Sequence, residues 1–285
     1  MPIFVNQQRV KTFNFPGGEC QVQIAASEIG DKTEVIAGLN SSDDILSLLL
    51  SVDAVRRIRP HTQLTLTIPY FPYARQDRIC NPGEALSLKV MADLINSLHC
   101  QQVIVVDPHS DVTPALLNHC QTITLAQLIT GSLLASKIQQ EQWALIAPDA
   151  GAEKKIRDVA KQLSTDSHAV EFHCARKVRN TVTGQIVSTE FHDNVQGKKL
   201  IIIDDICDGG QTFIELAKVL QSQGAEEIYL YVSHGIFSQG LSVLKPYFKS
   251  VYCYHTMLSP EQIEPEFLTV LGKSLELFTQ WNQGG

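Results

Sequence analysis

The chain has 285 residues, of which 44% are apolar and 19% are charged, and its formal net charge is −7. This composition is typical of a globular protein with a substantial core, long enough for two ordinary domains, and it excludes a disordered chain. The negative net charge argues against a nucleic-acid-binding protein, which usually carries a basic excess. It does not exclude an enzyme for a small anionic substrate, because a cleft concentrates charge of its own.

The cysteines and the apolar runs indicate the compartment. The seven cysteines are odd in number, scattered and never spaced as CxxC, which argues against a disulfide framework or a zinc site and favours a reduced setting. No apolar run has the length of a signal peptide or a membrane span. We therefore expect a soluble cytoplasmic protein without a membrane or nucleic-acid partner.

Short apolar strands alternate with helical patterns along most of the chain. Strands rich in Ile, Val and Leu are expected at 35–39, 64–69, 103–106, 143–147, 169–173, 200–203, 228–232 and 250–254. Helices are expected at 43–58, 86–98, 125–138, 152–163 and 212–223, the last of them ended by Gly224. The strands show little polar alternation, so both of their faces should be covered. The pattern predicts an α/β protein with doubly wound parallel sheets.

The two halves of the chain share a faint internal repeat. In each half a strand ends in a polar loop, a helix follows, and the next strand ends at a histidine, His109 or His234. We therefore expect two related α/β domains, residues 1–140 and 141–285. The segment from residue 257 to the end carries little signal, and we expect a peripheral helix there.

The stretch IIIDDICDGGQTF, residues 201–213, places carboxylates and glycines at the end of a buried strand. Ligands bind beyond the carboxyl ends of the strands in an open α/β sheet. Asp204 and Asp205 suit ribose hydroxyls or Mg²⁺, because both prefer ionised oxygen partners. The residues that follow suit an anion at a helix N-terminus: Asp208, Gly209, Gly210, Gln211 and Thr212. An ordinary capped acidic turn would explain Asp208 but not the whole run.

Three further strand ends carry polar loops. In IPYFPYARQDRI, residues 68–79, a charged run that begins at Arg75 follows aromatic residues and suits phosphate or a base. In VVDPHSD, residues 105–111, His109 is a candidate metal or phosphate ligand, although a lone histidine is more often structural. In APDAGAEKKI, residues 147–156, Asp149 suits a metal and equally suits a plain helix N-cap.

These motifs resemble those of a known family. IIIDDICDGGQT is similar to the ribose-phosphate loop of phosphoribosyl pyrophosphate synthetases and type I phosphoribosyltransferases, and IPYFPYARQDRI resembles the ATP-binding stretch of ribose-phosphate pyrophosphokinases, which the simple transferases lack. The resemblance to the ribose-phosphate pyrophosphokinase family runs from residue 15 to about residue 254. It implies two domains of the type I phosphoribosyltransferase fold, the N-terminal one binding ATP and the C-terminal one binding the ribose phosphate.

The resemblance also implies roles for individual residues. The residues expected to bind ATP are Phe15, Glu19, Arg75, Gln76, Asp77, Arg78 and His109, with Phe15 and Glu19 reaching the site of a neighbouring subunit. Those expected to bind the acceptor or the transferred group are Asp149, Ala150, Gly151, Ala152, Asp204, Asp205 and the residues 208–212. The expected metal ligands are His109, Asp149 and Asp204. The expected catalytic pair is Lys177 and Arg179, although Arg176 competes with Lys177 for the first position.

The implied reaction is the Mg²⁺-dependent transfer of the β,γ-pyrophosphate of ATP to the anomeric hydroxyl of ribose 5-phosphate. It yields phosphoribosyl pyrophosphate, a precursor for nucleotide biosynthesis, and AMP. A homo-oligomer, dimer or hexamer, is expected because one subunit completes the ATP site of another.

One departure from the family pattern leaves the acceptor open. The family has Thr where this chain has Gly209, and usually Gly where it has Gln211. A larger 5′-substituted ribose such as ADP-ribose is therefore an alternative acceptor, which would give ADP-ribose pyrophosphate and place the chain in NAD metabolism. A phosphoribosyltransferase and a catalytically silent regulatory homologue are the remaining alternatives.

Overall fold

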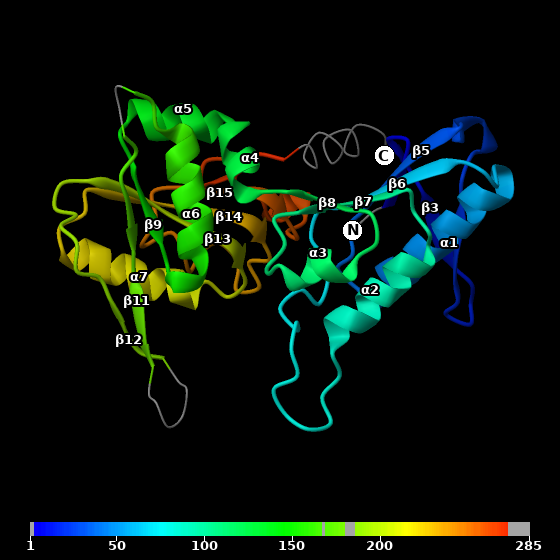
Figure 1. Ribbon diagram of the computed structural model, residues 1–285, viewed down its shortest axis with the longest axis horizontal. Coiled ribbons are helices and arrows are strands. Elements are labelled where there is room, and N and C mark those ends of the chain that lie inside the picture. The colour runs from blue at the N-terminus through cyan, green and yellow to red at the C-terminus, as the bar shows by residue number, and fades with distance from the viewer. Residues whose placement is uncertain (1–2, 167–168, 180–185, 273–285) are drawn as a thin grey trace. The chain divides into compact units, whose positions relative to one another are not determined.

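The computed structural model describes residues 3–166, 169–179 and 186–272, and it divides the chain into two compact units, Met1–Ile123 and Thr124–Gly285 (Figure 1). The predicted boundary after residue 140 assigned the helices α4 (Leu125–Thr130) and α5 (Leu133–Gln140) to the first domain, whereas the division at Ile123 leaves them in the second unit. Each unit has its own sheet and its own apolar core.

The first unit is built on a six-stranded sheet in the order β2-β1-β5-β6-β7-β8. The parallel strands are β5 (Lys32–Ala37), β6 (Gln63–Ile68), β7 (Gln102–Val106) and β8 (Cys120–Ile123). The short strands β1 (Ile3–Val5) and β2 (Gln8–Arg9) extend the sheet in antiparallel fashion. A separate hairpin is formed by β3 (Lys11–Asn14) and β4 (Cys20–Gln23).

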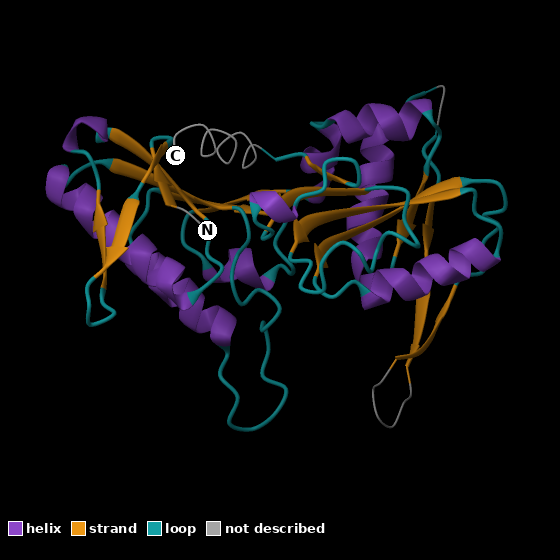
Figure 2. Ribbon diagram, turned by 180° about the vertical axis from the view of Figure 1, so that it is seen from behind, coloured by secondary structure: helices purple, strands orange, loops and turns teal. Residues whose placement is uncertain are grey.

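Helices cover one face of this first sheet (Figures 1 and 2). They are α1 (Ser42–Ile58) and α2 (Ser87–Ser97), and the short α3 (Val112–Leu116) and a 3₁₀ turn (Ala26–Glu28) complete the unit. The α1 helix begins where the Ser41 hydroxyl accepts the Asp44 N–H at 3.2 Å. Arg56 and Arg57 in its last turn complement the helix dipole. Apolar residues of α1 and α2 share one core with alternate residues of β5, β6 and β7.

The second unit is built on a parallel six-stranded sheet in the order β10-β9-β13-β14-β15-β16. Its strands are β9 (Ala144–Ala147), β10 (Phe172–Cys174), β13 (Lys199–Cys207), β14 (Glu227–Gly235), β15 (Val251–Thr256) and β16 (Leu268–Val270). The helices α4, α5 and α6 (Ala150–Leu163) cover one face, and α7 (Gln211–Ser222) covers the other. The strands β11 (Arg176–Arg179) and β12 (Ile186–Glu190) form an antiparallel hairpin outside the sheet.

The strand order reverses next to β9. The chain leaves β9 through α6 to β10 on one side, and it reaches β13 on the other side. The loops that follow β9 and β13 therefore diverge at the carboxyl ends of two adjacent strands. Such a reversal is the place where open α/β sheets bind their ligands.

The parallel α/β architecture is confirmed, and several element predictions need correction. The helix expected at 125–138 is interrupted at Gly131, because the Ser132 hydroxyl caps a new helix by accepting the Leu134 N–H. The strand expected at 200–203 continues to Cys207 because β14 pairs with it throughout. The described part of the C-terminal segment contains a 3₁₀ turn (Pro260–Gln262) and the strand β16, and the remainder of the segment in which a helix was expected, residues 273–285, lies outside the described residues. No helix in the described residues is long and apolar enough to cross a membrane.

Candidate active site

The two aspartates of β13 lie inside the strand. Asp204 pairs in register with Val232 of β14, and the Asp205 N–H donates to Asp204 Oδ1 at 2.9 Å. Asp205 is buried, with 8% of its surface exposed. The last residues of β13 thus hold two adjacent carboxylates at the switch point of the sheet.

Two neighbouring negative charges and burial perturb Asp204. Burial is the main cause that raises the pKa of the Asp204 carboxyl well above its usual value, and the charges of Asp205 and Asp149 raise it further. Asp149, which follows β9, therefore acts electrostatically on Asp204, which lies on β13. The structure brings together these two predicted ligands, and their excess negative charge suits a cation bound by hard oxygen atoms.

A glycine turn joins β13 to α7, and its two glycines differ in geometry. Gly210, with φ of +82°, is the N-cap of α7, and a Cβ placed on it would lie 2.9 Å from Leu244 Cδ2. Gly209 has no such restriction, because a Cβ there would be 3.6 Å from Gln239 Cγ, an ordinary contact. Only glycine fits the left-handed conformation at position 210 without strain, whereas position 209 has room for a side chain.

Gln211 and Thr212 form the first turn of α7. The exposed Gln211 amide donates from Nε2 to Glu215 Oε1 at 2.9 Å, one helical turn further along. The backbone N–H groups at this helix start are the predicted anion-binding groups.

The segment that follows β14 supports the glycine turn from behind. The N–H groups of Ile236 and Phe237 donate to the Cys207 carbonyl at 2.8 and 3.1 Å, and the Ser238 N–H donates to the Asp208 carbonyl at 3.1 Å. The Phe237 ring lies so close to Gly235 that a Cβ on that glycine would be 2.0 Å from the ring. Hydrogen bonds from the segment after β14 thus hold the Cys207 and Asp208 carbonyl groups where the glycine turn begins.

A second helix begins beside this turn, at the end of β9. Asp149 is the N-cap of α6, and its Oδ1 atom accepts the N–H groups of Gly151 at 2.9 Å and of Ala152 at 3.3 Å. The N-cap interpretation of Asp149 is therefore confirmed, and its role as a metal ligand stays a prediction. Ala150 and Gly151 are exposed at the helix start, and Ala152 is buried. Because β9 and β13 are adjacent, α6 and α7 both start at the same edge of the sheet.

In the first unit, the charged loop before α2 meets the end of β7. Burial would raise the pKa of the Asp77 carboxyl, but the nearby Ser110 hydroxyl, the hydrogen bond from Arg78 and the charge of His109 lower it below its usual value. Arg78 Nε donates to Asp77 Oδ1 at 3.0 Å, and the Asp77 side chain is only 6% exposed. Two predicted motifs that are distant in sequence thus come together at Asp77 and His109.

The other predicted ATP ligands lie on exposed segments of the first unit. Arg75 and Gln76 are exposed, and the Gln76 N–H donates to the Tyr73 carbonyl at 2.9 Å in the tight turn that precedes them. Phe15 and Glu19 lie on the turn of the β3–β4 hairpin, where the Phe15 N–H donates to the Glu19 carbonyl at 2.8 Å. Phe15 is 49% exposed and packs edge-on against Phe13 at 5.5 Å between ring centroids.

The predicted catalytic pair lies on the β11–β12 hairpin. Lys177 and Arg179 pair in register with Thr189 and Ile186, respectively. The structure describes the backbone of β11 here, and the side chains of this pair lie outside what it describes.

The predicted metal site has few protein ligands. Among the described residues, no group of three or more His, Cys, Asp or Glu side chains gathers as a cation site. Asp149 and Asp204 nevertheless fit Mg²⁺, which commonly takes one or two carboxylates and completes its shell with water and phosphate oxygens. A hydrogen-bonded network of Glu171, His173, Asp193 and Lys198 at the base of the β11–β12 hairpin was not predicted from the sequence, because its members become neighbours only in the fold.

Comparison with known proteins places the chain in a family. The sequence profile for the N-terminal domain of ribose phosphate pyrophosphokinase matches residues 3–98, and the profile for the phosphoribosyl transferase domain matches residues 116–261. The ribose-phosphate pyrophosphokinase of Aquifex aeolicus is 31% identical over 79% of this chain and 70% of that protein. A putative ribose-phosphate pyrophosphokinase of Enterococcus faecalis is 30% identical over 79% of this chain and 68% of that protein.

A solved structure has the same fold. The crystal structure of phosphoribosylpyrophosphate synthetase from Mycobacterium smegmatis matches 96% of this chain and 91% of its own, with a TM-score of 0.78 and 22% sequence identity. The profiles, the relatives and the fold agree with one another. The chain belongs to the ribose-phosphate pyrophosphokinase family of enzymes.

Proposed function

We propose that the chain transfers the β,γ-pyrophosphate of ATP to the anomeric hydroxyl of ribose 5-phosphate, giving phosphoribosyl pyrophosphate and AMP. The observation that carries the proposal is the arrangement at the switch point of the second unit. Two carboxylates of β13 and the N-termini of α6 and α7 meet there, at the edge where a sugar phosphate would bind. Membership of the ribose-phosphate pyrophosphokinase family supports pyrophosphate transfer as the reaction at this site.

In this proposal each unit binds one substrate. Arg75, Gln76, Asp77 and Arg78, together with His109, take ATP in the first unit. In the second unit, Asp204 and Asp205 accept hydrogen bonds from the ribose hydroxyls, which orients the anomeric oxygen towards the transferred group. The backbone N–H groups at residues 208–212 bind the acceptor's distal phosphate.

The reaction also needs neutralisation of negative charge. Asp149 and Asp204 would hold Mg²⁺, and this ion would neutralise negative charge on the transferred pyrophosphate. The Gly151 and Ala152 N–H groups at the start of α6 donate to Asp149 Oδ1 and so orient this carboxylate. Lys177 and Arg179 would stabilise the charge that develops in the transition state, because fixed cations act most strongly there. Phe15 and Glu19 would complete the ATP site of a second subunit in a homo-oligomer.

The direct test is an assay of the purified protein with MgATP and ribose 5-phosphate. We expect one AMP to be released for each molecule of product. The ³¹P spectrum of that product should show a pyrophosphate group attached to C1 of the sugar. The absence of AMP release with every ribose acceptor would refute the enzymatic function and favour a regulatory homologue. Consumption of phosphoribosyl pyrophosphate with a nucleobase would instead indicate a phosphoribosyltransferase.

A second candidate acceptor is ADP-ribose, and the geometry of the glycine turn favours testing it. Gly209 offers no hydroxyl to a terminal phosphate, although the turn has room for a Cβ at this position. Gln211 places an amide at the start of α7. An acceptor whose 5′-phosphate carries a further group presents fewer phosphate oxygens and would need fewer donors.

The substitution Gly209→Thr separates the two acceptors. Its hydroxyl should raise kcat/KM for ribose 5-phosphate about tenfold or more relative to Gly209→Val, which has the same shape without the hydroxyl, because a hydrogen bond to a charged group contributes about 1.5–3 kcal/mol. If the wild type strongly prefers ribose 5-phosphate over ADP-ribose, the second candidate is wrong.

A further inference from the structure

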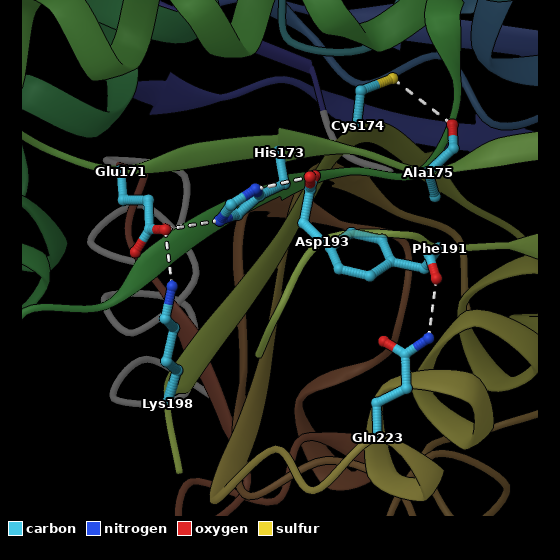
Figure 3. Close-up of polar contacts among 8 residues, drawn as sticks. All are labelled: Glu171, His173, Cys174, Ala175, Phe191, Asp193, Lys198 and Gln223. Atoms are coloured by element: carbon cyan, nitrogen blue, oxygen red, sulfur yellow. Dashed lines mark hydrogen bonds and ion pairs between the residues drawn. The ribbon is translucent and has the colours of Figure 1, made fainter. Parts of the chain in front are cut away.

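Four charged or titratable side chains meet at the base of the β11–β12 hairpin (Figure 3). His173 Nδ1 lies 2.9 Å from Asp193 Oδ2, and His173 Nε2 lies 2.9 Å from Glu171 Oε1. Lys198 Nζ donates to the same Glu171 oxygen at 2.6 Å. The His173 side chain is 13% exposed, so its ring is largely enclosed by these partners.

The network joins both ends of the hairpin. The backbone pairing of β11 and β12 ends at the pair Arg176 and Glu190. His173 comes three residues before Arg176, and Asp193 comes three residues after Glu190. The bond between His173 and Asp193 therefore closes the hairpin just beyond its last backbone pair.

The same network is anchored to the sheet and to α7. His173 pairs with Ile146 of β9, so its backbone is fixed in the sheet. The buried Phe191 ring packs against the imidazole edge-on, with 5.8 Å between ring centroids. Gln223, at the C-terminal end of α7, donates from Nε2 to the Phe191 carbonyl at 2.7 Å. The hairpin base is thus tied to the helix whose N-terminus forms the glycine turn.

The number of N–H groups on the His173 ring determines how many of its carboxylate partners it can hydrogen-bond. A neutral imidazole carries one N–H and can donate to only one carboxylate, whereas both ring nitrogens of His173 face carboxylate oxygens. The imidazolium, with two N–H groups, is the form that satisfies both partners. Glu171 is ionised for this role: its burial would raise the pKa of the carboxyl, but the Lys198 hydrogen bond and the His173 charge lower it.

We propose that His173, as an imidazolium held between Glu171 and Asp193, is a positioning residue that fixes the base of the β11–β12 hairpin and thereby the backbone that carries Lys177 and Arg179. This inference rests on the proposed function, because it assigns the hairpin to the transfer reaction. Without the imidazolium, one ring nitrogen presents a lone pair to a carboxylate oxygen in place of a hydrogen bond, which loosens the base of the hairpin. A small displacement of a charge-stabilising pair costs rate in the chemical step more than affinity for substrate.

The experiment compares His173→Ala and His173→Gln with His192→Gln. His192 lies two residues after β12 and pairs with Glu190 at 3.3 Å, but its side chain is 68% exposed, so it is a matched surface control. We expect His173→Ala to lower kcat about tenfold or more while KM for ATP changes less than about twofold. His173→Gln, which keeps one donor, should fall between the alanine variant and the wild type, and His192→Gln should match the wild type.

Two further readouts distinguish positioning from a merely structural role. In an Asp193→Ala background, His173→Ala should lower kcat much less than it does in the wild type, because the two residues act through one bond. Side-chain ¹⁵N NMR of the wild type should show a hydrogen bond from each His173 ring nitrogen to a carboxylate. An unchanged kcat in both His173 variants, or a hydrogen bond from only one of the two ring nitrogens, overturns the proposal. A wild type without transfer activity would overturn the proposed function instead, and the NMR result would still test the imidazolium.

Discussion

The glycine turn of the second unit allows a paired substitution with opposite expected outcomes. Gly210→Ala places a Cβ in the left-handed region, which costs about 1–2 kcal/mol for a residue other than glycine. The new Cβ also lies 2.9 Å from Leu244 Cδ2, and Leu244 is 1% exposed in the core. Moving that methyl group within a packed core adds about 1 kcal/mol or more.

The neighbouring Gly209→Ala is the control. Its Cβ would make an ordinary contact at 3.6 Å with Gln239, and its backbone is not in the left-handed region. Replacing glycine by alanine at a compatible site reduces the entropy of the unfolded chain and stabilises a protein by about 0.4–1 kcal/mol. We therefore expect Gly209→Ala to be neutral or slightly stabilising.

Thermal unfolding measures the difference. A loss of about 2–3 kcal/mol in the free energy of unfolding of a unit of this size should lower the Tm of Gly210→Ala by about 4–12 °C. The same variant should raise KM for the acceptor, since it would displace the helix start that is proposed to bind the acceptor's phosphate. Equal Tm values for the two alanine variants would falsify the assignment of the conformational constraint to Gly210.

Two further predictions concern buried carboxylates. Asp204→Asn should raise the free energy of unfolding of the substrate-free protein by on the order of 1 kcal/mol and abolish turnover, because the raised pKa of Asp204 means that its charged form destabilises the fold. The sign is that of a carboxyl with a raised pKa: the penalty grows as pH rises from about 3.9 and is fully present above the folded-state pKa, so the Tm advantage of the variant should vanish in acid. Asp77→Asn should lower stability and raise KM for ATP, whereas Arg78→Ala, at a side chain that is 76% exposed, should change stability by less than about 1 kcal/mol. Because the pKa of Asp77 is lowered, its contribution is present above about pH 3.9 and is lost as pH falls through the folded-state pKa. Equal Tm values at neutral pH for Asp204→Asn and the wild type, or a larger loss in Arg78→Ala than in Asp77→Asn, would contradict these assignments.

Much of the architecture followed from local pattern. The run of β14 is buried along nearly its whole length because helices cover both faces of its sheet, whereas β6 buries alternate residues, Leu64, Leu66 and Ile68, against helices on one face. Several other strands could not be predicted from such patterns. The strands β1 and β2 are too short for a periodicity, and β16 exists because β15 offers it a partner.

The polar loops of the candidate site were found from sequence because each one follows a strand. The position of these loops relative to one another could not be predicted from the sequence, since it depends on the order of the strands in the sheet. The electrostatic effect of Asp149 on Asp204 arises because β9 pairs with β13, although about fifty residues separate them. The bond between His173 and Asp193 likewise joins residues on different segments, and neither residue belongs to a recognisable motif.

The support behind the glycine turn has an evolutionary consequence. Gly210 and Gly235 cannot accept a side chain without moving Leu244 or Phe237, so substitutions at these two positions are disfavoured. Gly209 and Gln211 are under no such constraint from the backbone, because hydrogen bonds from the segment after β14 hold the carbonyl groups where the turn begins. Single substitutions at Gly209 or Gln211 can therefore change the chemistry that the glycine turn offers to the proposed ribose acceptor while the backbone of the turn stays the same.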